Sequence, residues 1–155
     1  MTLTEHRARE VRSLHGIQFH GFPNLFVIGG LHQAAVSINA PLVFHYQAHH
    51  VASVMRSLLN RGIRAADVTV EAVASWSDVI TARSTFSVDT ARNCTPGWAN
   101  NDGSYEPGQP NAFANAFGGG PFEYATVLQG WRDGSFEQDL TVEFAPKETA
   151  GGGAR

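Results

Sequence analysis

Residues 21–30 read Gly-Phe-Pro-Asn-Leu-Phe-Val-Ile-Gly-Gly, and this stretch decides the expected fold more than any other. Its centre, Leu25–Ile28, is a continuous apolar run with Pro-Asn before it and two glycines after it. A short apolar run between turn residues is typical of a strand that is buried on both faces in a parallel sheet. We therefore expect an α/β fold with residues 25–28 as a core strand.

The glycines after this run, Gly29 and Gly30, predict a turn where a ligand can approach the backbone, because no side chain blocks it. In open α/β sheets, ligands gather at the carboxyl ends of strands. Leu31 and His32 follow directly, and His32 would face a ligand bound at the turn. Paired glycines are also common turn residues, so from the residues alone a turn without a ligand and with His32 in solvent is the favoured interpretation.

Downstream of this turn, the clearest pattern is that of a helix over residues 41–60. Apolar residues recur there at spacings of three and four, which predicts one apolar stripe made of Phe44, Ala48, Val51, Met55 and Leu58. Pro41 suits the first turn of such a helix, and Gly62 suits its C-terminal cap.

Shorter elements are expected on both sides of this helix. Residues 17–19 and 68–70 are consistent with short strands. Residues 71–86 predict a second helix, with an apolar face formed by Val73, Trp76 and Ile80. A third helix is expected over residues 121–131, and the alternation of apolar and polar residues at 140–144 indicates an edge strand.

Composition limits what the chain can be. Its 155 residues, 43% hydrophobic and 16% charged, fit one globular domain. The net charge of −3 offers no basic surface for nucleic acid, and no apolar run is long enough to cross a membrane. The first ten residues lack the apolar segment of a secretory signal, so we expect a cytoplasmic protein.

Taken alone, the residues offer no complete catalytic set and no metal site. Cys94 is the only cysteine, which excludes an internal disulfide and a cysteine metal site. His45 and His49 lie four apart on the expected helix and could hold a metal with a third ligand, but a polar helix face is the favoured interpretation. The sequence contains neither G-x-S-x-G nor G-x-G-x-x-G, and the glycines at 118–120 are not followed by Lys-Ser or Lys-Thr.

A stretch rich in Gly, Asn and Pro runs from Pro96 to Pro121 with little periodicity. Irregular segments longer than about a dozen residues are usually functional or packed against something else. In so short a chain, this suggests that the support for the segment lies elsewhere. We therefore expect residues 1–145 to be an incomplete domain and residues 146–155 to be a disordered tail.

Three motifs in order along the chain resemble one family. The first is His15-Gly16-Ile17 followed by residues 21–26, and the second is Asn-Cys-Thr-Pro-Gly at 93–97 with Asn-Asn at 100–101 and a glycine at 103. The third is residues 118–134, with three glycines, a proline and the pair Glu123-Tyr124. Together these residues resemble the C-terminal portion of Baeyer–Villiger monooxygenases and related flavin-containing monooxygenases. The resemblance covers roughly residues 11–145.

The resemblance implies an enzyme that binds FAD and NADPH on two dinucleotide-binding domains. Such enzymes insert one oxygen atom from O₂ into a ketone, or oxidise a heteroatom. By resemblance, the turn beside the flavin ring would be formed by Gly29, Gly30, Leu31 and His32. A loop near NADPH and the substrate would include Cys94, Thr95, Pro96, Gly97 and Asn100.

The departures from the family pattern matter as much as the matches. Both cofactor fingerprints and the F-x-G-x-x-x-H-x-x-x-W signature are missing from this sequence, so the catalytic residues stay unassigned. The expected partners are therefore the missing N-terminal FAD- and NADPH-binding parts, on the same chain or on a separate polypeptide, and a small ketone or heteroatom substrate. Three alternatives stay open: a fragment, one half of a split enzyme, and a non-catalytic binding or interaction module. A fragment is expected to expose apolar surface and to be poorly soluble.

Overall fold

The computed structural model describes residues 2, 4–5, 12–29, 33–37, 39–83, 92–104, 116–134 and 136–146. Within these residues, the long helices are α2 (Ala40–Asn60), α3 (Val70–Arg83) and α5 (Gly120–Asp133). The strands β1 (Ile63–Val68) and β2 (Leu140–Phe144) pair antiparallel, and the 3-10 helix η1 (Trp98–Gly103) lies in the irregular stretch. The fold therefore mixes helix and strand.

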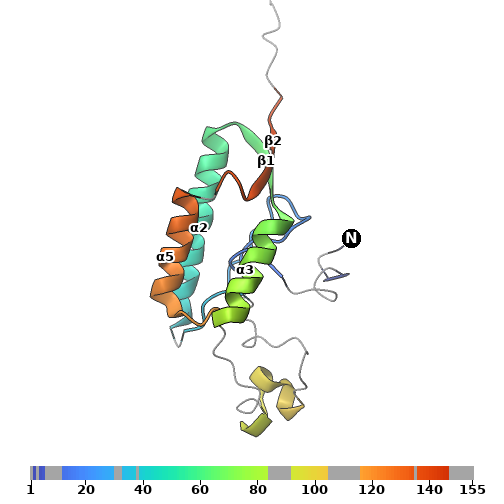
Figure 1. Cartoon of the computed structure of the whole chain (residues 1–155), viewed down its shortest axis with the longest axis vertical. Coiled ribbons are helices and arrows are strands. Elements are labelled where there is room, and N and C mark those ends of the chain that lie inside the picture. The colour runs from blue at the N-terminus through green and yellow to red at the C-terminus, as the bar shows by residue number, and fades with distance from the viewer. Residues whose placement is uncertain are drawn as a thin grey trace, which may run out of the picture.

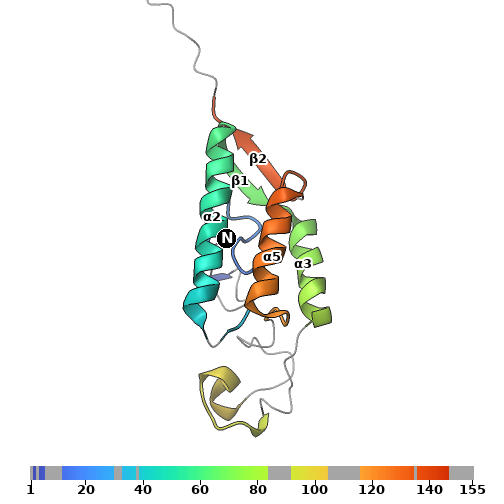
Figure 2. The same cartoon turned by 90° about the vertical axis from the view of Figure 1, so that its left-hand side faces the viewer.

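The three long helices lie side by side, with the strand pair at one end of them (Figures 1 and 2). Helices α2 and α5 run in the same direction, and α3 runs in the opposite direction. Helix α2 contacts both α5 and β1, so it links the helical layer to the strands.

The ends of α2 follow from local chemistry. The side chain of Asn39 accepts a hydrogen bond from the Leu42 N–H at 3.3 Å, which caps the first turn. Pro41 occupies that turn, as predicted. At the other end, Gly62 has a φ of +66° and its N–H donates to the Leu59 carbonyl at 3.0 Å, which ends the helix as expected of glycine.

The buried face of α2 differs from the predicted stripe. Met55 is 46% exposed and Ala48 is also exposed, so these two assignments were wrong. The buried residues are Val43, Gln47, His50, Val51, Val54 and Leu58. Two of these core positions hold the polar side chains of Gln47 and His50. The buried face of the helix is therefore not the face that hydrophobicity alone predicts.

The other helices and the last strand agree with the predictions, and the first strand does not. The apolar face of α3 is buried as expected, and β2 has the predicted bounds. Helix α5 extends one residue before and two after the expected range 121–131. The strand expected at 68–70 lies earlier, at β1, because Val70 already begins α3. Residues 84–86 of the second predicted helix and 147–155 of the predicted tail lie outside the described residues.

The predicted core strand at Leu25–Ile28 is wrong. Ile28 is 48% exposed, and Phe26 forms only an isolated bridge with Gln18. The core is filled instead by residues 13–19, all of which are buried without forming a regular strand. Residues 25–28 run alongside this buried segment, and the Val27 N–H donates to the Ile17 carbonyl at 2.8 Å.

The Gly-Phe-Pro-Asn motif binds one edge of β1. The Gly21 N–H donates to the Asp67 carboxylate at 2.9 Å, and the Asn24 N–H donates to the Ala66 carbonyl at 3.0 Å. The Asn24 side chain accepts from the Ala66 N–H at 3.1 Å and donates to the Arg64 carbonyl at 3.0 Å. This motif therefore satisfies backbone groups on the strand edge that β2 does not pair.

Replacing Asn24 with alanine is expected to lower the free energy of unfolding by about 2 kcal/mol. The variant loses both amide hydrogen bonds and places alanine at a φ of +61°, where a non-glycine side chain is strained. Urea denaturation measures the loss. Asn24→Gly relieves the backbone strain but does not restore the lost hydrogen bonds, so its free energy of unfolding should lie between those of Asn24→Ala and wild type. If both variants are as stable as wild type, the motif does not have this role.

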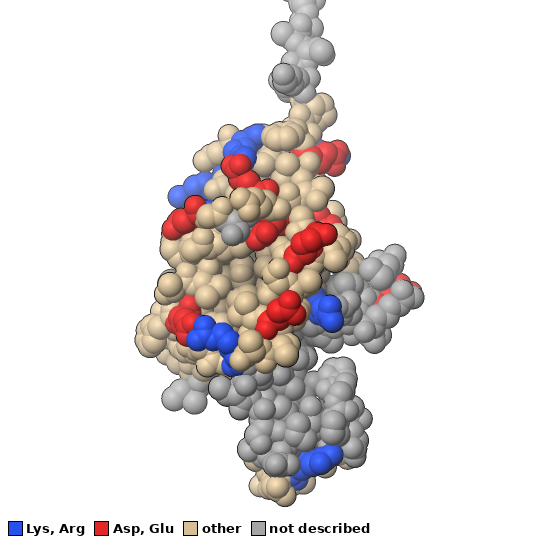
Figure 3. Space-filling view, in the orientation of Figure 1, with Lys and Arg blue, Asp and Glu red and all other residues tan. Residues whose placement is uncertain are grey.

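The described surface is mixed in charge. Acidic and basic side chains are interspersed on the face shown in Figure 3. The guanidinium of Arg83 pairs with the Glu123 carboxylate, with one N···O distance of 2.8 Å, and lies 5.2 Å from the centroid of the Phe117 ring. This contact ties the end of α3 to the start of α5. None of the described helices has the length and apolarity that a membrane span requires.

Candidate functional site

The expected ligand turn begins at a glycine that its backbone requires. Gly29 has a φ of +87°, a conformation that other residues adopt only with strain. A Cβ atom here would lie 3.6 Å from the Phe44 ring, so space alone would admit a side chain. The Gly29 N–H donates to the Gln47 Oε1 at 2.9 Å, which ties the turn to α2.

Gln47 belongs to a buried polar contact that we call the Gln47–Tyr124 anchor. Both side chains are completely buried. The Tyr124 hydroxyl donates to the His15 carbonyl at 2.5 Å, and the Gln47 Nε2 donates to the Tyr124 oxygen over a long 3.4 Å. Burial raises the pKa of Tyr124, and the hydrogen bond from Gln47 lowers it in part. The hydroxyl therefore stays protonated as a donor, and the anchor joins the Gly29 turn, α2, α5 and the segment at His15.

The far side of the turn is held by Gln33. Its Oε1 accepts a hydrogen bond from the Ser13 hydroxyl at 3.1 Å, and its Nε2 donates to the Ser77 hydroxyl at 3.1 Å. The Gln33 carbonyl accepts from the Trp76 indole N–H at 2.9 Å. Both flanks of the expected site are thus fixed to the helices. Gly30, Leu31 and His32 lie between them, outside the described residues.

The core contains a buried histidine–tryptophan cluster of His15, His50, Trp76 and Trp131. The His15 ring meets the Trp76 ring edge-on, with 4.8 Å between centroids, and lies 5.9 Å from the His50 ring. Burial, with a smaller contribution from His50, lowers the pKa of His15 to about 3. Burial also lowers the pKa of His50 to about 3, helped by the charge of Arg132. Both imidazoles are therefore neutral at physiological pH.

The contact between His50 and Arg132 fixes the position of the His50 proton. The Arg132 guanidinium lies 2.9 Å from His50 Nδ1. Because a guanidinium can only donate, Nδ1 accepts and the proton of the neutral ring lies on Nε2. His50 thereby holds Arg132 from the core side, between α2 and α5.

The predicted loop at residues 94–100 is organised by one buried amide. Asn100 is 3% exposed. Its Oδ1 accepts from the Gly97 N–H at 2.8 Å and from the Gly103 N–H at 3.2 Å, and its Nδ2 donates to the Cys94 and Thr95 carbonyls, both at 3.3 Å. Asn100 is thus committed to holding the loop. Cys94, Thr95 and Pro96 are exposed on it.

The structure keeps the two predicted site segments apart. Both views place residues 92–104 beyond the end of the helices at which α2 and α5 begin (Figures 1 and 2). Gly29, in contrast, is held against α2 by Gln47. The described residues therefore present a fixed turn and a separate folded loop rather than a single closed pocket.

Replacing Asn100 with alanine is expected to loosen this loop, because four hydrogen bonds from one side chain are lost. Cys94 is the only cysteine and is exposed, so a fluorescent probe attaches there alone. We expect the anisotropy of the probe to decay faster in Asn100→Ala than in wild type. Ser104→Ala, at the exposed end of the loop, is the control; equal decay in Asn100→Ala and wild type would contradict the role of Asn100.

The residues that hold the turn were largely missed from sequence. Gln47 and His50 carry a signal in hindsight, since each is a polar residue on the apolar side of a helix. His45 and His49 are exposed, and the described residues contain no group of three or more side chains placed to hold a metal ion.

Comparison with known proteins places the chain among flavin-dependent enzymes. No family model matches it. Pentalenolactone D synthase of Streptomyces arenae is 32% identical over 131 residues, 84% of this chain and 22% of that protein. The FAD-binding monooxygenase hmp7 of Hypomyces subiculosus is 31% identical over 88% of the chain and 22% of the enzyme. A Baeyer–Villiger monooxygenase of Streptomyces coelicolor is 31% identical over 86% of the chain and 21% of the enzyme.

Solved structures share the fold. The polycyclic ketone monooxygenase of Thermothelomyces thermophila superimposes with a TM-score of 0.75 at 23% identity, over 91% of this chain and 22% of that enzyme. A closed crystal structure of cyclohexanone monooxygenase gives a TM-score of 0.73 at 21% identity, over 94% of this chain and 26% of that enzyme. The chain therefore spans about a fifth to a quarter of the length of the proteins that it matches.

Proposed function

The chain belongs to the Baeyer–Villiger monooxygenase family, and we propose that it supplies the flavin-side turn and an active-site loop to an FAD- and NADPH-dependent member. The observation that carries this proposal is the identity of 31% over 86–88% of the chain to enzymes named as FAD-binding and Baeyer–Villiger monooxygenases. The substrate is proposed to be a small ketone, or a molecule with an oxidisable heteroatom.

In the proposed reaction, a ketone, O₂, NADPH and a proton give an ester, NADP⁺ and water. One oxygen atom enters the carbon–carbon bond beside the carbonyl, and the other leaves as water with two electrons from NADPH. FAD, when bound, supplies the oxygen-activating chemistry. The role proposed for the residues described here is to position the cofactor and substrate, and the residues that transfer protons stay unassigned.

The Gly29 turn fits the approach of a planar ring. Gly29 carries no side chain of its own, is half-buried and is fixed by Gln47. The Phe44 ring covers the side on which a Cβ would lie, at 3.6 Å, so a planar ring would have to approach the backbone from another side. The Gly29 N–H is already used by Gln47, so hydrogen bonds to a flavin would have to come from Gly30, Leu31 or His32. The anchor would keep the turn in place as the cofactor binds.

Exposed apolar side chains support the idea that this chain works within a larger assembly. Leu59 and Phe122 are each 73% exposed, and Phe144 is 60% exposed. Leu59 and Phe144 belong to the end that carries the strands, and Phe122 belongs to the other end. Such residues suit contacts with the FAD- and NADPH-binding parts that the proposal requires.

The experiment is to isolate the native polypeptide from its source cells with an antibody against this segment. We expect the isolated material to contain flavin, to oxidise NADPH faster when a ketone is added, and to place one ¹⁸O atom from ¹⁸O₂ in the product. Flavin on a co-purifying second polypeptide would indicate a split enzyme. Material without flavin or NADPH oxidation would overturn the proposal in favour of a non-catalytic module.

A further inference from the structure

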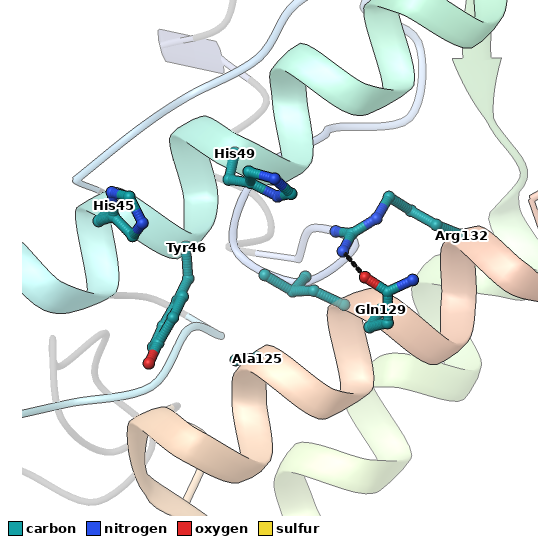
Figure 4. Close-up of a pocket in the computed structure, with 7 residues that line it drawn as sticks. His45, Tyr46, His49, Ala125, Gln129 and Arg132 are labelled. Carbon is teal, nitrogen blue, oxygen red and sulfur yellow. Dashed lines mark hydrogen bonds between the residues drawn. The ribbon is translucent and has the colours of Figure 1, made fainter.

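A cleft of about 280 Å³ lies between α2 and α5, away from Gly29 and the loop at 92–104. Its walls carry His45, Tyr46 and His49 from α2, and Gln129 and Arg132 from α5, with Leu128 also in the lining (Figure 4). The lining contains several nitrogen donors and no carboxylate. The proposed monooxygenase function gives this cleft no role.

Two hydrogen bonds hold the Arg132 side chain in the cleft and engage only some of its N–H donors. Its Nη1 donates to His50 Nδ1 at 2.9 Å, and its Nη2 donates to the Gln129 Oε1. A guanidinium has five N–H groups, so these two bonds leave three without a hydrogen-bond acceptor among the described residues. The held guanidinium thus presents a fixed fork of donors, the geometry that matches the oxygens of a carboxylate or phosphate.

The charge of Arg132 is not neutralised by an ion pair among the described residues. The carboxylate of the next residue in the chain, Asp133, accepts hydrogen bonds from the Gln129 amide at 2.8 and 2.9 Å. Partial burial lowers the pKa of Arg132, and Asp133 raises it in part. An anion in the cleft would therefore relieve an incompletely balanced, half-buried cation.

The two histidines add to the same preference. His45 and His49 lie on successive turns of α2 and line the cleft; Figure 4 places His49 across from Arg132 and His45 farther along α2, beside Tyr46. Their imidazole N–H groups and the Tyr46 hydroxyl can donate to oxygens that the guanidinium leaves free. We propose that the α2–α5 cleft binds a small molecule through an oxyanion group, a carboxylate or a phosphate, held by Arg132 and His49.

The test is a titration of the isotope-labelled full chain with inorganic phosphate and, separately, with acetate, followed by NMR. Chloride keeps the ionic strength constant, so that general screening does not mimic binding. We expect saturable shifts of the Arg132 and His49 side-chain signals with at least one of the two anions. The stronger response identifies phosphate or carboxylate as the preferred group.

Matched variants make the result specific. Arg132→Gln removes the positive charge and His49→Ala removes the imidazole donor, so each should weaken binding by about 10- to 100-fold. Arg56→Gln removes an exposed arginine from α2 outside the cleft and should bind as wild type does. His49 is exposed, so its variant tests the site even where Arg132→Gln disturbs the packing around His50. Wild-type chain without saturable shifts, or equal weakening in Arg56→Gln, would overturn the proposal.

Discussion

Lowering the pH from about 6.5 to about 3 is expected to remove several kcal/mol from the free energy of unfolding. Burial lowers the pKa of both His15 and His50 from 6.5 to about 3 in the folded chain. Above pH 6.5 both rings are neutral in either state, so nothing is lost there. Between the two values the unfolded chain binds protons that the folded chain excludes, and each histidine contributes a loss of up to about 1.4 kcal/mol per pH unit.

Ordinary domains are stable by only ~5–15 kcal/mol, so this loss alone can approach complete unfolding. Urea titrations at a series of pH values measure it. His50→Gln keeps an oxygen that can accept from Arg132 but does not titrate, so its stability should fall less steeply with acid. His45→Gln, at an exposed position, should follow the wild-type curve. If His50→Gln also follows that curve, the buried histidines do not control the acid response.

Replacing Gln47 with leucine is expected to cost about 2–3 kcal/mol of stability. The variant leaves the Gly29 N–H without its acceptor and removes the contact with the Tyr124 hydroxyl, while leucine fills a similar volume. Amide hydrogen exchange at Gly29 should accelerate by more than the change in global stability accounts for. That local effect distinguishes the loss of the anchor from a general weakening of the core.

Gln138→Leu is the matched control, since Gln138 is exposed near the start of β2. It makes the same chemical change without touching the turn, and we expect its stability and its exchange at Gly29 to equal those of wild type. Wild-type exchange at Gly29 in Gln47→Leu would show that the turn does not depend on the anchor.

The three long helices and the strand β2 were predictable because local signals set them. Pro41 and Gly62 mark α2, the apolar spacing marks α3, and the alternation at 140–144 marks β2. The core strand at Leu25–Ile28 was not predictable, because apolar character alone does not show which of several segments the fold buries. The chain buries residues 13–19 instead. This segment contains the buried polar side chains of His15 and Gln18, which hydrophobicity would place outside a core.

The structure describes only parts of the predicted site, and its contacts with cofactor and substrate stay predictions. The expected turn is present at Gly29, and residues 94–100 form a folded loop. The Gln47–Tyr124 anchor was out of reach, since its members lie 77 residues apart and meet only when α2 packs on α5. The same holds for Arg132, whose position depends on a histidine 82 residues away. Long-range polar contacts leave no periodic trace in a sequence.

The most direct test of the proposed role is the visible circular dichroism of flavin in the native protein that carries this segment, with Gly29→Ala compared with Gly62→Ala. Both glycines have positive φ, +87° and +66°, so both alanine variants carry similar backbone strain. Gly62 lies at the end of α2 near the strands, far along the helix from Gln47. We predict that Gly29→Ala changes the flavin spectrum and that Gly62→Ala does not. A spectrum unaffected by Gly29→Ala would contradict the placement of this turn beside the flavin.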